Sequence, residues 1–290
     1  MLEKISTGQG FVAALDQSGG STPGALAAYG VSADAYATDN EMFAAMHEMR
    51  VRIITSPCFN GDKVIGAILF EKTMDGEADG RPVPDVLKGR GVVPFLKVDK
   101  GLDEERNGVK LMKPMPDLDA LLARAVAKGM FGTKMRSVIE LANRVGIAAI
   151  VDQQFELAEQ ILDTGLVPII EPEVSIKSPE RGAADRLLLA ELTRALDALP
   201  ETRKVMLKLT LPAEPNLFAP LVAHPRVLRV VALSGGFSRA DACRQLAQNS
   251  GVIASFSRAL LADLRAQMSD AEFDRTLGSA IDEIYGCSVI

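Results

Sequence analysis

The chain has 290 residues, 48% of them hydrophobic and 24% charged, and its formal net charge is −6 at pH 7. This composition excludes a disordered chain, and the negative charge argues against a nucleic-acid or anionic-membrane partner. Three widely spaced cysteines, an N-terminus without an apolar signal core, and apolar runs far below the about 20 residues of a membrane helix predict a reduced, soluble, cytoplasmic protein.

Eight short apolar runs follow one another along the chain, and each is continuous rather than alternating. Runs of this kind are typical of strands that are buried on both faces of a parallel sheet. The runs span residues 10–15, 64–70, 91–97, 130–135, 166–170, 205–209, 228–233 and 252–256.

Helical patterns fill the intervals between these runs. Residues 183–199 place five apolar side chains on one helical face, and Pro200 ends the pattern. Ser238 with Asp241, and Ser269 with Glu272, have the spacing of capping boxes at helix starts. Residues 138–162 are expected to form two helices packed end to end before the fifth strand.

Alternating strands and helices without a linker rich in Gly, Pro or Ser predict an α/β fold, a single (β/α)8 TIM barrel over residues 1–290. An open, doubly wound sheet of similar content is the alternative. In a barrel the working residues lie at the carboxyl ends of the strands. The polar residues and glycines that end or follow the runs are Asp16, Ser18, Ser21, Lys97, Lys134, Arg136, Glu171, Glu173, Lys208, Ser234, Gly235, Gly236, Ser255, Ser257 and Arg258.

Lys208 interrupts the apolar run "VMLKL". One interpretation is a lysine at a strand end whose ammonium reaches water. The other is a desolvated, nucleophilic amine, because burial and a second ammonium, here that of Lys134, make a lysine easier to deprotonate. Attack on a carbonyl would then need an acid and a base, and Glu171 and Asp16 suit these roles.

Glycine turns and helix starts near basic residues indicate phosphate sites. "LSGG" at 233–236 together with Arg258 predicts one site beside the last two strands, where barrels often bind phosphate. Ser18, Ser21 and Lys97 predict a second site. Two such sites around a reactive lysine indicate a substrate that is phosphorylated at both ends.

Metal chemistry is not indicated. The chain has only two histidines, His47 and His224, and neither CxxC nor HExxH occurs. We therefore expect no metal and no cofactor. A pyridoxal-phosphate enzyme would also use a lysine, but nothing in the sequence suggests a partner for the pyridine ring.

The motifs "AALDQSGGS", "FLKVDKG", "GTKMR", "LVPIIEPE", "MLKLT", "LSGG" and "SFSRAL" resemble, in order and with compatible spacing, those of class I (Schiff-base) fructose-1,6-bisphosphate aldolases. The likeness covers roughly residues 8–265 and is closest to the short bacterial branch. The resemblance implies reversible cleavage of fructose 1,6-bisphosphate to glycerone phosphate and glyceraldehyde 3-phosphate, in glycolysis and gluconeogenesis, without metal.

The resemblance also implies residue roles. Lys208 forms the imine, Glu171 is the acid and base in its formation, and Asp16 takes the proton from the carbon 4 hydroxyl. Lys134 stabilises charge nearby, and Glu173 lies beside Lys208 and Lys134. Ser234, Gly235 and Arg258 match residues that hold the phosphate on carbon 1, whereas Ser18, Ser21 and Lys97 match those near the phosphate on carbon 6.

Two features depart from the animal members of that family. Gln17 replaces the acidic residue that follows the aspartate. Animal members also end in a tyrosine that assists proton exchange at carbon 3, whereas this sequence ends in "IYGCSVI". Tyr285 is a candidate substitute, with a packed or surface position as the alternative.

Other functions remain open from the sequence. An imine-forming aldolase or transaldolase could act on other sugar phosphates, and a barrel could use its basic mouth only to bind an anionic metabolite or protein. Small-molecule sugar phosphates are the expected ligands, and a homo-oligomer is possible.

Overall fold

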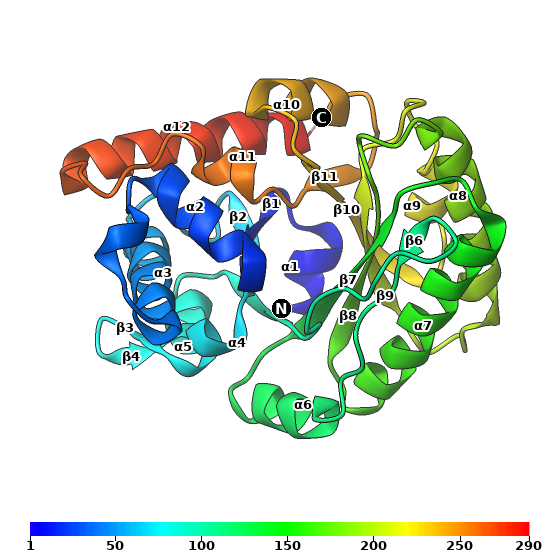
Figure 1. The fold of residues 1–290 in the computed structure, drawn as a ribbon, viewed down its shortest axis with the longest axis horizontal. Helices are drawn as coiled ribbons and strands as arrows, with labels where there is room; N and C mark the ends of the chain where they lie inside the picture. Colours follow the sequence, from blue (N-terminus) through cyan, green and yellow to red (C-terminus); the bar gives the residue numbers. More distant parts are fainter. Residues whose placement is uncertain (290) are drawn as a thin grey trace.

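The computed structural model describes residues 1–289, except for the side chain of Ser21. Eight parallel strands, each beside the next in sequence, form a nearly closed barrel (Figure 1). They are β1 (Phe11–Leu15), β2 (Val64–Leu69), β5 (Val93–Lys97), β7 (Gly132–Ile139), β8 (Val167–Val174), β9 (Val205–Thr210), β10 (Val227–Leu233) and β11 (Val252–Ala254). The Ala14 amide donates to the Phe256 carbonyl at 3.2 Å and joins the first strand to the end of the last. The predicted barrel and all eight predicted strands are confirmed.

Helices surround the strands, and α1 (Leu2–Thr7) lies within the ring in Figure 1. The others are α2 (Thr22–Tyr29), α3 (Asp39–Thr55), α4 (Glu71–Asp75), α5 (Val83–Gly89), α6 (Leu118–Ala127), α7 (Arg144–Asp163), α8 (Arg181–Ala198), α9 (Ala219–Val222), α10 (Arg239–Leu246), α11 (Arg258–Leu261) and α12 (Asp270–Ser288). Short strands β3 (Glu77–Ala78) and β4 (Arg81–Pro82) pair with each other, and β6 (Val109–Lys110) pairs antiparallel with the end of β7.

Apolar side chains form two separate cores. The inner core fills the barrel and includes Val12, Phe95, Ile169 and Met206, together with Ile5 from α1. The outer core lies between the strands and the helices. Because successive side chains of a strand point to opposite faces, a strand such as β9 contributes to both cores, with Met206 in the inner core and Leu207 in the outer core.

The predicted helix starts at Ser238 and Ser269 are confirmed. Each serine is an N-cap, and its hydroxyl accepts a hydrogen bond from the amide three residues later. The helix predicted over 183–199 is α8, which ends at Ala198 just before Pro200. All five residues of its predicted apolar face are buried, namely Leu188, Leu192, Ala195, Leu196 and Leu199.

The prediction of two helices over residues 138–162 is wrong. Val138 and Ile139 continue strand β7, because they pair with Glu173 and Val174 of β8 and with β6. A single helix, α7, then begins after Asn143, whose side-chain oxygen accepts from the Gly146 amide at 3.0 Å. The β-branched side chains of Val138 and Ile139 suit this strand extension.

Candidate active site

Strand periodicity explains why charged residues gather at the carboxyl ends of the strands, an opening that we call the mouth. In β9, Met206 belongs to the inner core, so Lys208 two residues later also faces the barrel interior, whereas Leu207 and Leu209 belong to the outer core. The same alternation places Glu171 two residues after Ile169 in β8. Lys208 is therefore an inward side chain above the inner core, and only 4% of its surface is exposed.

Four charged side chains form a continuous chain of contacts across the barrel. Lys134 Nζ donates a hydrogen bond to Asp16 Oδ2 at 3.0 Å and lies 2.6 Å from Glu171 Oε2. Lys208 Nζ lies 3.0 Å from the other oxygen of Glu171, Oε1. Glu171 thus bridges the two lysines from the strand between them. We call Asp16, Lys134, Glu171 and Lys208 the mouth cluster.

The electrostatics of the mouth cluster keep its carboxylates ionised. Burial by itself raises the pKa of Asp16, but Lys134 and Lys208 outweigh it and hold that pKa well below its usual range. The same two lysines lower the pKa of Glu171 in spite of its burial. Burial disfavours the charged form of Lys134, yet Asp16 and Glu171 raise its pKa well above the usual value. Lys134 is consequently a fixed positive charge near Lys208.

Glu173 does not contact either lysine. Its Oε2 lies 2.5 Å from Arg136 Nε. Arg136 follows Lys134 by two residues in β7, and Glu173 follows Glu171 by two residues in β8. Burial opposes the charge of Arg136, but Glu173 raises its pKa. The expected contact of Glu173 with Lys134 and Lys208 is therefore replaced by an Arg136–Glu173 pair. The reason is geometric, since Glu171 already occupies the space between the two ammonium groups.

Lys97 reaches the mouth from β5 and is held by the loop that follows it. Its Nζ lies 2.6 Å from Asp99 Oδ1 and donates to the Asp99 carbonyl at 2.9 Å. Asp99 is buried, and its Oδ2 has no hydrogen-bond partner among the described residues. Sequence reasoning missed Asp99, although the motif "KVDKG" contains it.

The turn after β10 has the backbone that the glycines predict. Gly235 and Gly236 have φ angles of 59° and 113°, a region that favours glycine. A Cβ atom on Gly236 would lie 3.4 Å from Arg258 Nη2, so the guanidinium of Arg258 is directly beside this turn. Ser234 is buried at the end of the same strand. The structure therefore brings Ser234, both glycines and Arg258 together.

The last strand and the first strand meet through polar side chains. Gln17 Nε2 donates to Ser257 Oγ at 2.5 Å, so the residue after Asp16 is joined to the loop after β11. Ser255 is buried, and its hydroxyl has no partner among the described residues. Ser18 lies in the same loop as Gln17, and the side chain of Ser21 lies outside the described part of the structure.

Two buried residues near the cluster were not predicted. Gln154 of α7 accepts a hydrogen bond from the Glu171 amide at 2.9 Å through its side-chain oxygen. Arg50 of α3 donates to the main-chain carbonyl of Gln17. Each is a polar side chain on the apolar face of a helix, and this is the signal that could have identified them.

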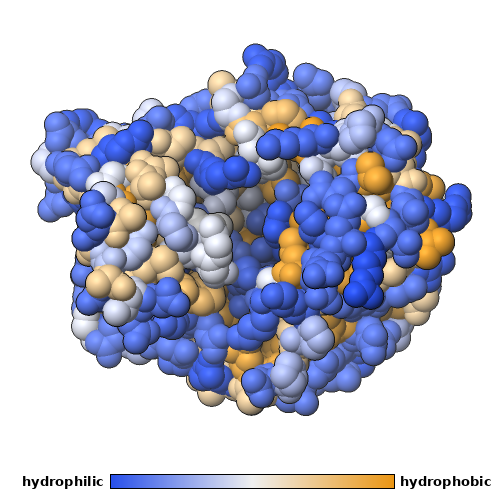
Figure 2. Space-filling model, viewed as in Figure 1, coloured by the Kyte–Doolittle hydropathy of each residue, from blue (hydrophilic) through white to orange (hydrophobic). Residues whose placement is uncertain are grey.

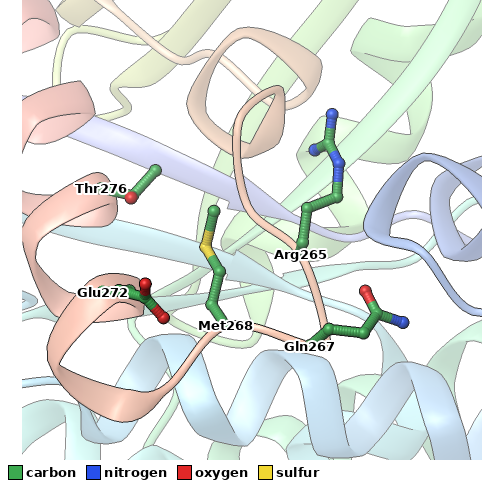
Figure 3. Close-up of a pocket in the computed structure, with 5 residues that line it drawn as sticks. All are labelled: Arg265, Gln267, Met268, Glu272 and Thr276. Atoms are coloured by element: carbon green, nitrogen blue, oxygen red, sulfur yellow. The ribbon is translucent and has the colours of Figure 1, made fainter.

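One pocket is separate from the mouth cluster. It has a volume of about 460 Å³ and lies along the segment that leads into α12, as Figure 3 shows, where it is lined by Arg265, Gln267, Met268, Glu272 and Thr276. None of these residues was predicted for the site. In Figure 2 the molecule is hollowed near its centre, and both hydrophilic and hydrophobic residues border the hollow.

Comparison with known families identifies the chain. The model of the family described as "Fructose-bisphosphate aldolase class-I" matches residues 3–191. The chain belongs to this family. The matched range contains Asp16, Lys97, Lys134 and Glu171 of this aldolase but ends before Lys208.

A solved structure supports the fold of this aldolase. A fructose-bisphosphate aldolase from Plasmodium falciparum, in complex with TRAP and a small-molecule inhibitor, aligns with a TM-score of 0.80 at 19% identity, over 99% of this chain and 92% of that chain. A sugar phosphate isomerase/epimerase from Parabacteroides distasonis aligns with a TM-score of 0.46 at 10% identity, over 96% of this chain and 97% of that chain. The first alignment confirms the barrel, and the second carries no further argument.

Tyr285 lies at the wrong end of this aldolase to reach Lys208. Its ring centroid is 5.9 Å from Lys63 Nζ, and Lys63 immediately precedes β2, at the amino end of the barrel strands. Tyr285 is also partly buried against the outer core. Of the two alternatives for this residue, the structure therefore favours the packed one. Among the described residues, no group of three or more His, Cys, Asp or Glu side chains is placed to hold a metal ion, and within residues 1–289 no helix is both long and apolar enough to span a membrane.

Proposed function

We propose that this class I aldolase cleaves fructose 1,6-bisphosphate reversibly to glycerone phosphate and glyceraldehyde 3-phosphate through an imine on Lys208, without a metal. The observation that carries the proposal is the contact of a buried lysine with Glu171, whose other oxygen meets Lys134. We assign this reaction to glycolysis and gluconeogenesis in the cytoplasm, with sugar phosphates as the ligands.

Imine formation uses Lys208 and Glu171. The unprotonated Nζ of Lys208 attacks the ketone carbon of the sugar and forms a carbinolamine. Glu171, 3.0 Å from Nζ, accepts the proton that the nitrogen loses. It then returns a proton to the hydroxyl, which leaves as water, and the iminium ion remains.

Carbon–carbon cleavage uses Asp16. Its carboxylate takes the proton from the carbon 4 hydroxyl while the bond between carbons 3 and 4 breaks. The electron pair of that bond moves into the iminium and gives an enamine, and the aldehyde product leaves. The fixed charge of Lys134, hydrogen-bonded to Asp16, stabilises the ionised base before the transfer. Protonation at carbon 3 and hydrolysis release the second product and regenerate Lys208.

The two phosphates bind on opposite sides of the mouth cluster. The turn at Gly235 and Gly236, with Arg258 beside it, offers backbone amides and a guanidinium to the phosphate on carbon 1. Lys97, at the end of β5, offers its ammonium to the phosphate on carbon 6, together with the loop that follows β1.

A cleavage assay with one substitution tests the proposal. We expect Lys208→Met to lose at least ~1000-fold in kcat, because no other side chain replaces the nucleophile, while Lys204→Met, at an exposed lysine four residues earlier, keeps the wild-type rate. A metal chelator should leave the wild-type rate unchanged. Cleavage that survives Lys208→Met, or that the chelator abolishes, would contradict the proposal.

Lys97 distinguishes a bisphosphate aldolase from an aldolase or transaldolase for monophosphates. Lys97→Met should raise KM for fructose 1,6-bisphosphate about 10-fold more than KM for fructose 1-phosphate, because only the bisphosphate loses a charge-assisted contact. Lys100→Met, at an exposed lysine paired with Glu71, is the matched control. Equal effects on both substrates would favour the other sugar phosphates.

A further inference from the structure

Arg50 is a buried cation without an ion pair. It lies on α3, only 1% of its surface is exposed, and no carboxylate lies within ion-pair distance of it in the described part of the chain. Buried arginines are ordinarily paired with carboxylates, because an isolated buried charge costs several kcal/mol. A cation held at this cost needs a function that a neutral side chain would not provide.

The contacts of Arg50 point to the loop that follows β1. One terminal nitrogen, Nη2, donates to the main-chain carbonyl of Gln17, the residue directly after Asp16. The other, Nη1, donates to Thr73 Oγ1 at 2.9 Å, and the guanidinium lies 5.9 Å from the ring centroid of Phe70. Arg50 thus ties α3 and the start of α4 to the backbone beside Asp16.

The charge of Arg50 also acts on Asp16. Burial lowers the pKa of Arg50 to about 10, and the negative charge of Asp16 works in the opposite direction. Arg50 therefore remains a cation at neutral pH. Asp16 is the carboxylate whose negative charge favours the charged form of Arg50.

We propose that Arg50 is a positioning residue for Asp16, which holds the following carbonyl in place and adds a positive charge behind the carboxylate. This inference rests on the proposed role of Asp16 as the base for carbon–carbon cleavage. It assigns to Arg50 no contact with the substrate.

Four other charged groups face Asp16, and each comes from a strand. Lys134 of β7, Lys208 of β9 and Lys97 of β5 favour its ionised form, whereas Glu171 of β8 is a like charge. Arg50 differs from these because it comes from a helix outside the barrel. Its removal therefore changes the electrostatic field at Asp16 and the support of the Gln17 carbonyl, but it removes no member of the mouth cluster.

The test separates cleavage from imine formation, since only cleavage uses Asp16. Arg50→Met should lower kcat for cleavage of fructose 1,6-bisphosphate by about 100-fold, the scale of a displaced general base. Borohydride trapping of glycerone phosphate on Lys208 should keep its wild-type rate. Arg50→Lys keeps the charge but cannot donate to Thr73 and to the Gln17 carbonyl at the same time. We expect its kcat for cleavage to fall by about 10-fold, between the wild-type protein and Arg50→Met.

A carbon-13 NMR titration of the Asp16 carboxyl group, assigned with Asp16→Asn, measures the electrostatic effect without turnover. Its midpoint should rise by about 0.5–1 pH unit in Arg50→Met and stay near the wild-type value in Arg50→Lys. Arg90→Met removes a partly buried arginine that binds carbonyls at Thr55, Ser56 and Phe59, and it should change neither the midpoint nor kcat.

The outcomes separate the two proposals. If Arg50→Met reduces trapping and cleavage equally, or leaves both the titration midpoint and kcat unchanged, Arg50 is only a packing residue and the inference is overturned. If Arg50→Met does not fold, Arg50→Lys decides, because a wild-type kcat in that variant would contradict the role of the Gln17 contact. If the wild-type protein forms no imine, the proposed function fails, and the NMR midpoints alone still test the electrostatic effect.

Discussion

Lys134 has two carboxylate contacts, and it is the residue on which the mouth cluster depends most. Asp16 and Glu171 are both buried, and Asp16 has no other ion pair in the described part of the chain. Removal of one partner leaves an uncompensated buried charge, which is far more costly than the loss of a surface pair. The cluster is therefore a set of mutually dependent charges.

Lys134→Met should lower the free energy of unfolding by about 3–5 kcal/mol and abolish most of the activity, because Asp16 loses its partner. Urea unfolding followed by circular dichroism measures the first effect. Lys128→Met is the control, since Lys128 pairs with Asp75 at 3.3 Å in a more exposed setting and should cost under about 1 kcal/mol. Equal losses in the two variants would contradict the mutual dependence of the buried charges.

At the residue scale, sequence reasoning found Lys208 because an ammonium inside an apolar run is conspicuous. Arg50 gives a similar signal, since it lies on the helical face of Met42, Met46, Met49 and Ile53. The sequence alone does not separate Arg50 from the usual case, because an arginine in an amphipathic helix ordinarily lies on the solvent face. The partner of Glu173 could not be predicted, because two lysines and one arginine are within reach of two glutamates, and only side-chain geometry decides the pairs.

At the element scale, strand positions were predictable and one helix was not. Continuous apolar runs identify buried strands directly, whereas the end of β7 depends on pairing with β6 and β8. Within the segment 138–162 the helix begins only at Arg144, and the residues before it do not share the helical periodicity. Tertiary pairing overrides local pattern at such boundaries.

The start of α12 offers a test of a local prediction. Ser269 and Glu272 form a reciprocal capping box, with the Glu272 carboxylate accepting from the Ser269 amide at 2.9 Å. Ser269→Ala should cost about 1 kcal/mol in the free energy of unfolding, and Ser269→Asp should restore most of it. Thermal unfolding compares the three proteins. A loss in the aspartate variant as large as that in the alanine variant would show that the cap is not the cause.

At the scale of the whole molecule, closure of the barrel brings charged residues that are far apart in sequence together at the mouth. Asp16 and Lys134 are 118 positions apart, and Gln17 and Ser257 are 240 apart. The sequence predicts this convergence only by way of the barrel fold, because all eight strands of a barrel have their carboxyl ends at one opening. The contacts inside the mouth required the structure.

The mouth cluster should make the stability of the whole protein fall in acid. Asp16 and Glu171 have folded-state pKa values below their ordinary 3.8 and 4.5, so they stabilise the fold above those values and lose this effect as the pH falls. Lys134 has a raised pKa, so its contribution is full below 10.5 and is lost only at higher pH. Urea unfolding should show a plateau from about pH 6 to 9 and a decline below about pH 4.

Asp16→Asn provides the control for that profile. The variant removes one of the two carboxylates, so its stability should decline less steeply in acid than that of the wild-type protein. An identical acid slope in both proteins would mean that other carboxylates cause the decline.

Reduction with borohydride tests most directly whether Lys208 is the nucleophile. The protein is incubated with glycerone phosphate or fructose 1,6-bisphosphate, treated with borohydride, and mapped by peptide mass spectrometry. We predict one stable adduct, on Lys208, that is absent without sugar phosphate. The absence of an adduct with either compound, or an adduct confined to another lysine, would contradict the account.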